Sequence, residues 1–436
     1  MNERTTVIGG GLAGCEAAWQ LARRGLPVRL YEMRPRKMTA AHQGGGLAEL
    51  VCSNSLRASA VSNAVGLLKE ELRRLHSLVM AAADATAVPA GAALAVDRQA
   101  FSAYIETAIA ACPLIELRRE EVTELPEQGI CIIAAGPLAS EALSAALSAR
   151  IGGQYLYFHD AIAPIIDAES IDMSVAFFAS RYGKGAGDDY LNCPLDKQQY
   201  LRFYQALLEA ELHPLHGFEQ QLFEGCMPVE ALARRGVDTL RFGPLKPVGL
   251  PLAGGREAYA VVQLRKENAH GSAYNMVGFQ TRLTYGEQRR VFRLIPGLEQ
   301  AEFFRLGSMH RNTYVNAPLL LDEHSRLKSE PRLYVAGQLS GVEGYVESAA
   351  SGLAAGVCAA AELAGREPPR FPRQTALGSL LAYLHTAGSG FQPSNINFGL
   401  MPPLTQRIRN KQEKNAVIAE RALSALAEFC RVNDGA

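Results

Sequence analysis

A glycine-rich hexapeptide near the N-terminus has the residue types and spacing to bind a dinucleotide. It reads Gly9-Gly10-Gly11-Leu12-Ala13-Gly14, lies between a β-branched stretch and a helical pattern, and matches GxGxxG. Its glycines permit a tight turn and close approach of the backbone to a pyrophosphate, and the N–H groups at a helix N-terminus bind phosphate. Glu32 follows a second predicted strand, where a carboxylate would accept hydrogen bonds from a ribose diol.

A second glycine turn indicates which dinucleotide to expect. Residues 333–336 predict an apolar strand that runs into Gly337-Gln338, and a helix of small residues is expected from about 345 to 363. Two backbone approaches from distant parts of the chain suit a long flavin cofactor better than a nicotinamide. Because no second GxGxxG occurs in the sequence, we expect FAD to be the resident cofactor and a nicotinamide cofactor to bind only transiently.

Two cysteines are candidates for a nucleophilic thiolate. Cys226 lies just before a helix predicted over residues 228–235, whose positive end would favour the thiolate. Cys52 ends an apolar run in a polar loop and could be activated as well. From the residues alone neither cysteine is preferred, and His310 fits a structural role as well as a ligand contact. The cysteines in predicted helices or a strand are expected to pack in the core: Cys15, Cys131 and Cys358.

The elements that must position these residues alternate strand and helix at both ends of the chain. A βαβ opening, a strand at 130–133 and another at 333–336 indicate one sheet, to which the chain returns after a long excursion. One domain is therefore expected to be discontinuous. We expect a cofactor-binding domain over residues 1–155 and 311–436, which ends in helices, and an insertion domain over 156–310 on the substrate side.

Length and composition limit the class of protein. The 436 residues are 48% hydrophobic and 20% charged, which suits two or three folded domains and excludes a disordered chain. Eight cysteines without a CxxC pair or a Cys/His cluster predict neither a disulfide framework nor a metal site. No signal peptide is indicated, and the uncharged run at 348–361 is expected to be too short and glycine-broken to span a bilayer. We expect a cytoplasmic protein with no membrane partner.

Charge is balanced overall and uneven along the chain. The 44 Lys and Arg residues equal the 44 Asp and Glu residues, so a polyanion would have to meet a local patch. Residues 151–233 contain 4 basic and 12 acidic residues, whereas residues 234–311 contain 13 basic and 6 acidic ones. The basic segment includes Arg289 and Arg290. A charge run is also typical of a solvated face, so the count alone leaves both interpretations open.

Several segments together resemble the folate- and FAD-dependent tRNA uracil-5-methyltransferase family. They are ELVCSNSL at 49–56, NAVGLLKE at 63–70, VPAG at 88–91, GCMPVE at 225–230, FGPLKPVGL at 242–250, MHRNT at 309–313, VEGYVES at 342–348 and FQPSNINFGL at 391–400. They follow one another in order over nearly the whole chain. The resemblance implies an α/β fold, in which a Rossmann-like FAD-binding domain of the glutathione-reductase type carries an inserted α+β domain.

The resemblance also implies an activity. The chain would methylate C5 of the T-loop uridine at tRNA position 54, with 5,10-methylenetetrahydrofolate as the carbon donor and NAD(P)H as the reductant. Cys226 and Cys52 would be the reactive cysteines: we expect Cys226 to add to C6 of uracil, and Cys52 to assist or to lie beside the flavin. His310 is expected near the pterin and the flavin, and Arg289 and Arg290 at the tRNA. No metal and no obligate protein partner is inferred.

Three other functions stay open at this point. The same chemistry could act on ribosomal RNA, or the chain could chiefly bind or refold tRNA with FAD as a structural group. The paired cysteines argue against the second of these. A small-molecule flavin oxidoreductase would suit the neutral net charge, and it would turn over NAD(P)H rapidly without RNA.

Overall fold

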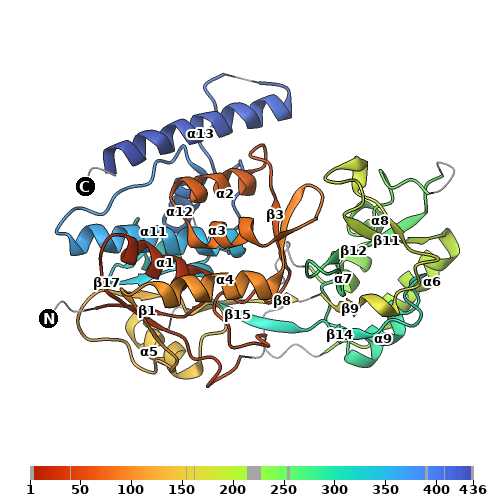
Figure 1. Cartoon of the computed structure of the whole chain (residues 1–436), viewed down its shortest axis with the longest axis horizontal. Helices are drawn as coiled ribbons and strands as arrows, with labels where there is room; N and C mark the ends of the chain where they lie inside the picture. The colour runs from red at the N-terminus through yellow and green to blue at the C-terminus, as the bar shows by residue number, and fades with distance from the viewer. Residues whose placement is uncertain are drawn as a thin grey trace.

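The chain forms two lobes, each built around its own sheet (Figure 1). The computed structural model describes residues 4–39, 41–153, 155–161, 163–213, 227–252, 256–387, 391–406 and 408–433. We call residues 4–153 and 317–433 the first lobe, and residues 163–305 the second lobe. The first lobe carries both ends of the chain, at the left of Figure 1, and the second lobe is formed by the middle of the chain.

A six-stranded sheet forms the centre of the first lobe. Its order is β16 (Arg326–Leu327), β17 (Glu330–Val335), β7 (Cys131–Ile133), β1 (Thr5–Ile8), β2 (Val28–Tyr31) and β6 (Ile115–Arg118). All neighbours except the β16–β17 pair are parallel. The carboxyl ends of β1, β2, β7 and β17 therefore meet along one edge, where open α/β sheets bind their ligands. The chain does return to its first sheet, as the strand pattern predicts.

Two helices that are distant in sequence pack closely over this sheet. α1 (Leu12–Arg23) follows β1, and α11 (Tyr345–Leu363) has the bounds that the small residues predict. A Cβ atom on Gly352 would lie 2.1 Å from the carbonyl oxygen of Ala13, and one on Gly356 would lie 2.7 Å from that of Ala17. These glycines allow the two helix backbones to approach each other.

Among the described residues, α11 is the one helix whose length and composition would let it cross a membrane. The helix has 19 residues and extends beyond the uncharged run at 348–361. Its glycines do not interrupt it, so the expectation that they break this run is wrong. However, 83% of its most apolar window is buried inside the structure. Its apolar character is explained by packing against α1 and the sheet.

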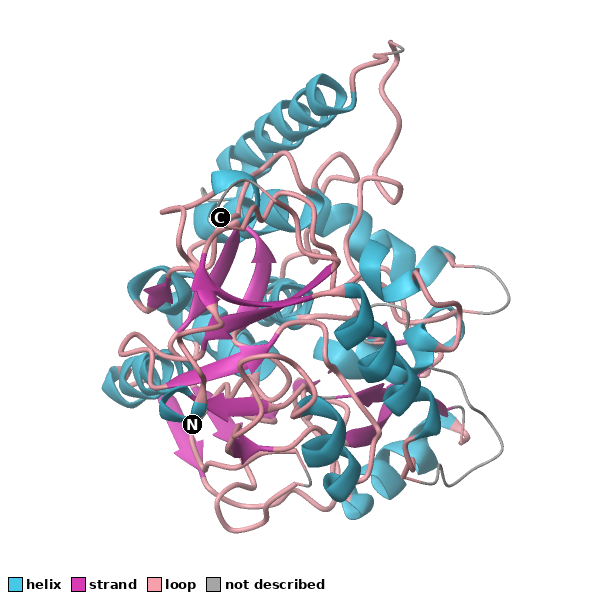
Figure 2. Ribbon diagram, turned by 90° about the vertical axis from the view of Figure 1, so that its right-hand side faces the viewer, coloured by secondary structure: helices cyan, strands magenta, loops and turns pink. Residues whose placement is uncertain are grey.

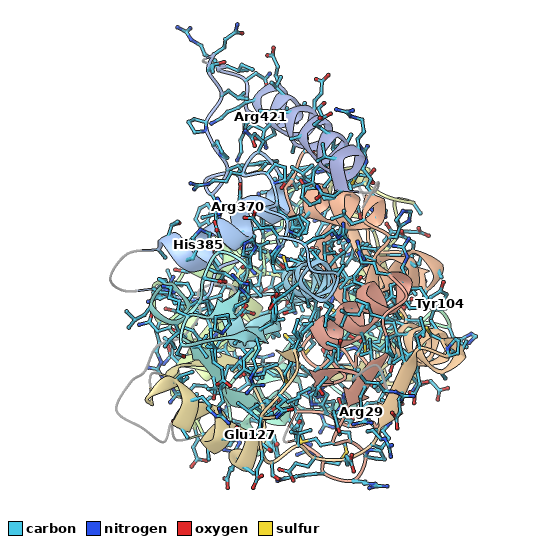
Figure 3. All side chains as sticks on the ribbon, turned by 90° about the vertical axis from the view of Figure 1, so that its left-hand side faces the viewer. Arg29, Tyr104, Glu127, Arg370, His385 and Arg421 are labelled. Carbon is cyan, nitrogen blue, oxygen red and sulfur yellow. The ribbon has the colours of Figure 1, made fainter. Side chains whose placement is uncertain are left out.

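The remaining elements of the first lobe cover the sheet and extend beyond it. The helices are α2 (Ala64–Arg74), α3 (Leu78–Ala85), α4 (Arg98–Ala111), α5 (Glu141–Ile151), α10 (Ala317–Leu320), α12 (Ala376–Thr386) and α13 (Lys411–Asn433), with the short helix η4 (Gly337–Ser340). A small sheet has the strand order β3 (Ser55–Ala58), β5 (Ala93–Val96) and β4 (Ala87–Val88). Helix α13 lies at the outer end of the lobe. Figure 3 labels Arg421 on this helix, at the opposite end of the view from Arg29 in β2.

An antiparallel sheet forms the second lobe (Figure 2). Its order is β10 (Phe177–Phe178), β11 (Tyr190–Leu195), β12 (Ala260–Lys266), β13 (Ala273–Met276), β9 (Ile165–Asp167) and β14 (Phe303–Arg305). Its helices are α6 (Lys197–Glu209), α7 (Val229–Ala233), α8 (Thr239–Phe242) and α9 (Tyr285–Phe292), with the short helices η1 (Ala168–Ser170) and η2 (Arg181–Gly183). Aromatic side chains of this lobe form a core separate from that of the first lobe, with Phe203, Phe279 and Phe292 fully buried.

Two paired strands connect the lobes. β8 (Tyr155–Ala161) leads into the second lobe and β15 (Met309–Val315) leads back, and they pair in antiparallel fashion from Tyr155 with Val315 to Ala161 with Met309. A two-stranded connection of this kind brings both ends of an insertion back to one place. The predicted domain boundaries, after residues 155 and 310, fall within these strands and stay predictions.

Candidate cofactor and active site

The glycine turn after β1 is built from residues with different tasks. Gly9 has a φ of +106°, and a Cβ atom there would lie 2.4 Å from the carbonyl oxygen of Ala134. A Cβ atom on Gly14 would lie 1.7 Å from the carbonyl oxygen of Gly9. Gly11 has an ordinary φ of −79°, and its Cβ would meet no atom within 4 Å. The fold therefore requires Gly9 and Gly14, whereas the absence of a side chain at Gly11 only leaves space.

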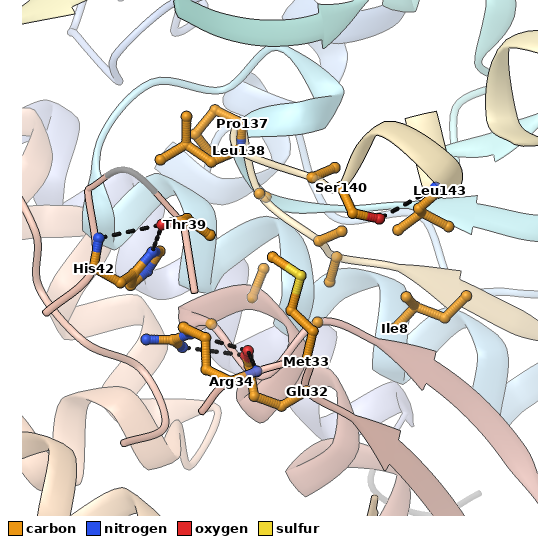
Figure 4. A pocket seen from close by; sticks show the side chains of 18 of the residues that line it. Ile8, Glu32, Met33, Arg34, Thr39, His42, Pro137, Leu138, Ser140 and Leu143 are labelled. Atoms are coloured by element: carbon orange, nitrogen blue, oxygen red, sulfur yellow. Dashed lines mark hydrogen bonds and ion pairs between the residues drawn. The ribbon is translucent and has the colours of Figure 1, made fainter. Parts of the chain in front are cut away.

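That space belongs to a cavity of about 1020 Å³ at the carboxyl edge of the parallel sheet (Figure 4). The predicted cofactor residues that line it are Gly9, Gly11, Leu12, Ala13, Glu32, Gly337 and Gln338. Gly10 and Gly14 are not in the lining: Gly10 donates its N–H to Glu32, and Gly14 packs inside the turn. The structure thus brings together the two glycine turns that the sequence separates by more than three hundred residues.

The cavity fits a dinucleotide. No side chain caps the N-terminus of α1 in the described structure, so its first N–H groups are open to a phosphate. The cavity lining includes the ends of β2 and β1 and the turn after β17, so Glu32 and both glycine turns face one space.

Glu32 lies at the end of β2, as predicted, but its carboxylate already accepts hydrogen bonds from Arg34. Oε1 accepts hydrogen bonds from the N–H and Nε of Arg34, both at 2.9 Å, and Oε2 accepts from Gly10 N at 3.0 Å and Arg34 Nη2 at 3.1 Å (Figure 4). Burial acts to raise the pKa of Glu32, and these hydrogen bonds outweigh it and lower the pKa. A ribose diol would therefore have to replace hydrogen bonds from Arg34 rather than meet a free carboxylate.

Cys52 lies beside the cavity and is partly buried. The residue before it, Val51, lines the cavity together with Tyr345, and the N–H of Cys52 donates to the Tyr345 hydroxyl oxygen at 2.6 Å. Two arginines of the second lobe bind the residues on either side of Cys52: Arg265 donates to the Ser53 hydroxyl, and Arg305 donates to the carbonyl oxygen of Val51.

Nothing in the sequence around Cys52 indicates that these arginines and Tyr345 are its neighbours. They come from β12, β14 and the start of α11, and they meet the cysteine only through tertiary contacts. The only sequence signal was the resemblance itself, because the segment with Tyr345 belongs to one of the matching motifs.

Cys226 falls outside the described residues, so its role stays a prediction. The structure resumes at Met227, and Pro228 is the N-cap of α7. The helix predicted over 228–235 is therefore only five residues long, from Val229 to Ala233, because the chain turns away at Gly236 with a φ of +146°. A helix of this length has a small dipole, which weakens the argument that it favours a thiolate.

The side chain of His310 also lies outside the described residues. Its backbone is part of β15, where it pairs with Asp160. Three residues further along the strand, Thr313 donates its N–H to the carbonyl oxygen of Pro137 at 3.1 Å, and Pro137 lines the cavity. β15 therefore passes beside the cofactor cavity, and contact of His310 with pterin and flavin stays a prediction.

Arg289 and Arg290 lie exposed on α9, and Arg290 pairs with Glu287 one turn earlier. Several other arginines of the basic segment bind groups within the protein. Arg241 lies 3.7 Å from the centre of the Tyr259 ring, and Arg293 donates to the carbonyl oxygen of Ala301. The sequence count therefore overestimates the positive charge available to a polyanion. RNA contact by Arg289 and Arg290 stays a prediction.

The other candidate groups behave as structural residues. Cys15, Cys131 and Cys358 are buried, and burial raises the pKa of Cys131 and of Cys358 to about 12. Within the described ranges, no three His, Cys, Asp or Glu side chains are grouped to hold a metal ion.

Comparison with known proteins agrees with this architecture. The family model of glucose inhibited division protein A (GIDA) matches residues 4–367. Two curated proteins named methylenetetrahydrofolate--tRNA-(uracil-5-)-methyltransferase TrmFO are similar to the chain: the one from Heliobacterium modesticaldum is 59% identical over 432 residues, and the one from Geobacter sulfurreducens is 60% identical over 430 residues. Each alignment covers 98% of both chains.

A solved structure shows the same fold. Aquifex aeolicus GidA, in its form II crystal, matches with a TM-score of 0.71 and 18% sequence identity, over 98% of this chain and 73% of that chain. Together with the family match, this likeness confirms the predicted fold class, a Rossmann-like α/β flavoprotein fold.

Proposed function

The chain belongs to the glucose inhibited division protein A family and, within it, to the methylenetetrahydrofolate–tRNA-(uracil-5-)-methyltransferases, and we propose that it methylates C5 of the T-loop uridine at tRNA position 54. The product is 5-methyluridine, and the carbon comes from 5,10-methylenetetrahydrofolate. One observation carries the activity: proteins of that name are 59% and 60% identical to this chain over 98% of its length.

The cavity provides what this reaction needs from a cofactor site. A folate methylene is two electrons more oxidised than a methyl group, and bound FAD supplies these electrons after reduction by NAD(P)H. Gly9 and Gly14 build the turn for the pyrophosphate, and Gly11 leaves the space that it fills. Gly337 and Gln338 line the cavity beside this turn, where a Cβ atom on Gly337 would lie 3.0 Å from that of Ala13, and Gln338 is held by a 2.6 Å hydrogen bond to Glu343.

The uracil ring requires a thiolate, because C5 becomes nucleophilic only after addition at C6. We assign this addition to Cys226: a sulfur–carbon bond forms at C6, and C5 bonds to the folate-derived methylene carbon. Loss of the C5 proton breaks the bond between that carbon and its carrier nitrogen, and addition of a hydride equivalent to the methylene gives the methyl group and releases the thiolate from C6. Cys52 lies beside the cofactor cavity, next to Val51 and hydrogen-bonded to Tyr345, which both line it, and this position supports an assisting role beside the flavin. His310 is assigned to the pterin.

The substrate is the one that the names of the relatives specify. Their names specify tRNA, so ribosomal RNA, tRNA refolding and small-molecule oxidation are not favoured. The T-loop base is tucked into folded tRNA and must be exposed to reach a protein cavity. We place the enzyme in the cytoplasm, with no obligate protein partner.

Transfer of labelled carbon tests the proposal. Purified protein with FAD, NAD(P)H and labelled 5,10-methylenetetrahydrofolate should place label in 5-methyluridine of unmodified tRNA, and a transcript with cytidine at position 54 should stay unlabelled. Methylation driven by S-adenosylmethionine alone would refute the carbon source. Label in ribosomal RNA but not in tRNA would refute the substrate, and fast NAD(P)H consumption without RNA would favour the oxidoreductase.

A further inference from the structure

One row of side chains crosses the second sheet on the face toward the first lobe. The strand register pairs Tyr190 with Arg265, Arg265 with Asn275 and Asn275 with Ile165. Ile165 pairs with Arg305 across a register shift after Phe303, and the hydrogen bonds of Arg305 to Val51 and Ala41 show that its side chain faces the first lobe as well. Residues directly opposite each other in antiparallel strands project from the same face of the sheet. We call Tyr190, Arg265, Asn275, Ile165 and Arg305 the crossing row.

Both arginines of the crossing row bind the loop that carries Cys52. Arg265 donates through Nη2 to the Ser53 hydroxyl at 2.7 Å and through Nε to the Asn54 carboxamide oxygen at 2.9 Å. Arg305 donates through Nη1, at 2.7 Å, to the carbonyl oxygen of the residue before the cysteine. The second lobe therefore holds the backbone and side chains on both sides of the thiol.

The first lobe holds the same loop from the other side. The Tyr345 hydroxyl accepts the N–H of Cys52, and Arg98 at the start of α4 donates to the carbonyl oxygen of Leu50. Arg98 also pairs with Glu267 of the second lobe, which is two residues beyond Arg265. The cysteine thus lies in a segment fixed from two lobes, and the thiol has little freedom beyond the rotation of its own side chain.

Arg265 is suited to this task by its shape and its burial. Only 6% of the residue is exposed, so its charge is costly unless its donors are satisfied. A guanidinium directs several N–H groups in a fixed plane, whereas a lysine offers a single flexible ammonium group. An arginine can therefore fix two neighbouring acceptors relative to each other, and lysine at this position cannot.

We propose that Arg265 and Arg305 are positioning residues that fix the Cys52 thiol at the cofactor cavity. Through them, the inserted lobe sets the geometry of a residue that belongs to the first lobe. The inference rests on the proposed role of Cys52 in methylation. A displacement of about 1 Å from reactive geometry can reduce a rate by about a hundredfold, so a small relaxation of this loop would be visible in turnover.

Alkylation of each cysteine, followed by mass spectrometry, tests the proposal separately from activity. Arg265→Lys should raise the iodoacetamide reaction rate of Cys52 by about tenfold, because two charge-assisted hydrogen bonds to its loop are weakened. The buried Cys131 and Cys193, one in each lobe, report general loosening and should not change. The methylation kcat should fall by about tenfold, with KM for folate and the flavin spectrum retained.

The matched control is Arg293→Lys. Arg293 also donates through Nε and Nη2, at 3.1 Å and 2.9 Å, but to Ala301 within the second lobe. This variant should change neither the alkylation of Cys52 nor turnover. If Arg265→Lys does not fold, Ser53→Ala removes one acceptor from the other side of the contact and should shift Cys52 in the same direction by a smaller factor.

Two results would overturn the positioning role: an unchanged Cys52 rate in the Arg265 and Ser53 variants, or equal acceleration of Cys131 and Cys193 in Arg265→Lys. Full methylation by Cys52→Ala would instead contradict the proposed function of Cys52. It would leave the alkylation result intact, so the two failures are distinguishable.

Discussion

At Gly11, the missing side chain matters for the ligand rather than for the backbone. Its φ is ordinary and a Cβ would meet no protein atom, but the residue lines the cofactor cavity. We expect Gly11→Val to fold with an apoprotein melting temperature within about 2 °C of wild type, and to lose more than nine-tenths of its FAD. Flavin absorbance per chain, together with a melting curve of the apoprotein, measures both.

Two further glycine variants make this result specific. Gly286 on exposed α9 also has open space around its Cβ position, so Gly286→Val should keep the full flavin content. Gly14→Val should fail to fold, because its Cβ would collide with the carbonyl oxygen of Gly9. A Gly11→Val protein that stays yellow would show that the pyrophosphate binds elsewhere.

The two reactive cysteines can be separated with tRNA that contains 5-fluorouridine. Fluorine replaces the C5 proton, so the covalent adduct at C6 cannot resolve and remains as a denaturation-resistant protein–RNA band. We expect Cys226→Ala to retain FAD, to lose methylation by at least a hundredfold and to form no band. Cys52→Ala should also lose turnover but still form the band.

The opposite pattern in this experiment would reverse the assignment of the two cysteines. Cys131→Ala is the matched control, because that cysteine is buried in a strand and should affect neither the band nor the rate of methylation. A change in the flavin spectrum of Cys52→Ala would support its place beside the cofactor cavity.

At the scale of single elements, one buried carboxylate joins distant helices. Glu71 of α2 accepts the N–H groups of Ala376 and Leu377 at the start of α12, at 2.7 Å and 2.8 Å. The N–H groups of a first helical turn have no partner within the helix, and a carboxylate is a good acceptor for them. Burial nevertheless raises the pKa of Glu71 to about 7.

This carboxylate predicts a pH dependence of stability. Unfolded Glu71 releases its proton near its ordinary pKa of about 4.5, and folded Glu71 releases it near 7, so between these values the folded state binds the extra proton. The free energy of unfolding should therefore fall as pH rises through this window, by up to about 3 kcal/mol. In Glu71→Gln this contribution is absent.

Urea unfolding at several pH values between 4.5 and 8 measures the effect. The stability of Glu71→Gln minus that of wild type should increase with pH across the window and level off above it. Glu70→Gln, which removes a partly exposed carboxylate from the same helix, reports how much of the change comes from charge alone. A difference independent of pH would contradict a proton held by folded Glu71.

The elements around the glycine turn could be predicted because their signals are local. Strand, turn and helix follow one another within residues 5–24, and the small residues of 345–363 mark a helix that packs closely. The crossing row could not be predicted: Arg265, Asn275 and Arg305 become neighbours only through pairing of strands far apart in sequence. Likewise, nothing local to Glu32 indicates that Arg34 occupies its carboxylate.

At the scale of the whole molecule, the two lobes contribute differently to the site. The first lobe contains the dinucleotide cavity, and the second lobe reaches it through the crossing row and the paired strands β8 and β15. A chain with equal numbers of acidic and basic residues has no overall attraction for tRNA. Binding must then depend on local basic groups that are exposed at the surface.

The salt dependence of tRNA binding tests which groups those are. Arg289 and Arg290 are exposed on α9 of the second lobe, and each phosphate contact contributes about 0.7–0.9 to the slope of log K against log salt. Replacing both by Ala should weaken binding at low salt and flatten the slope by up to about 1.8, with the flavin spectrum unchanged.

The matched control replaces Arg73 and Arg74, a neighbouring pair on α2 of the first lobe that also forms ion pairs, and removes the same charge. If the two double variants flatten the slope equally, net charge and not the α9 surface governs binding. If neither does, Arg289 and Arg290 are a solvated face, and the tRNA phosphates meet other residues.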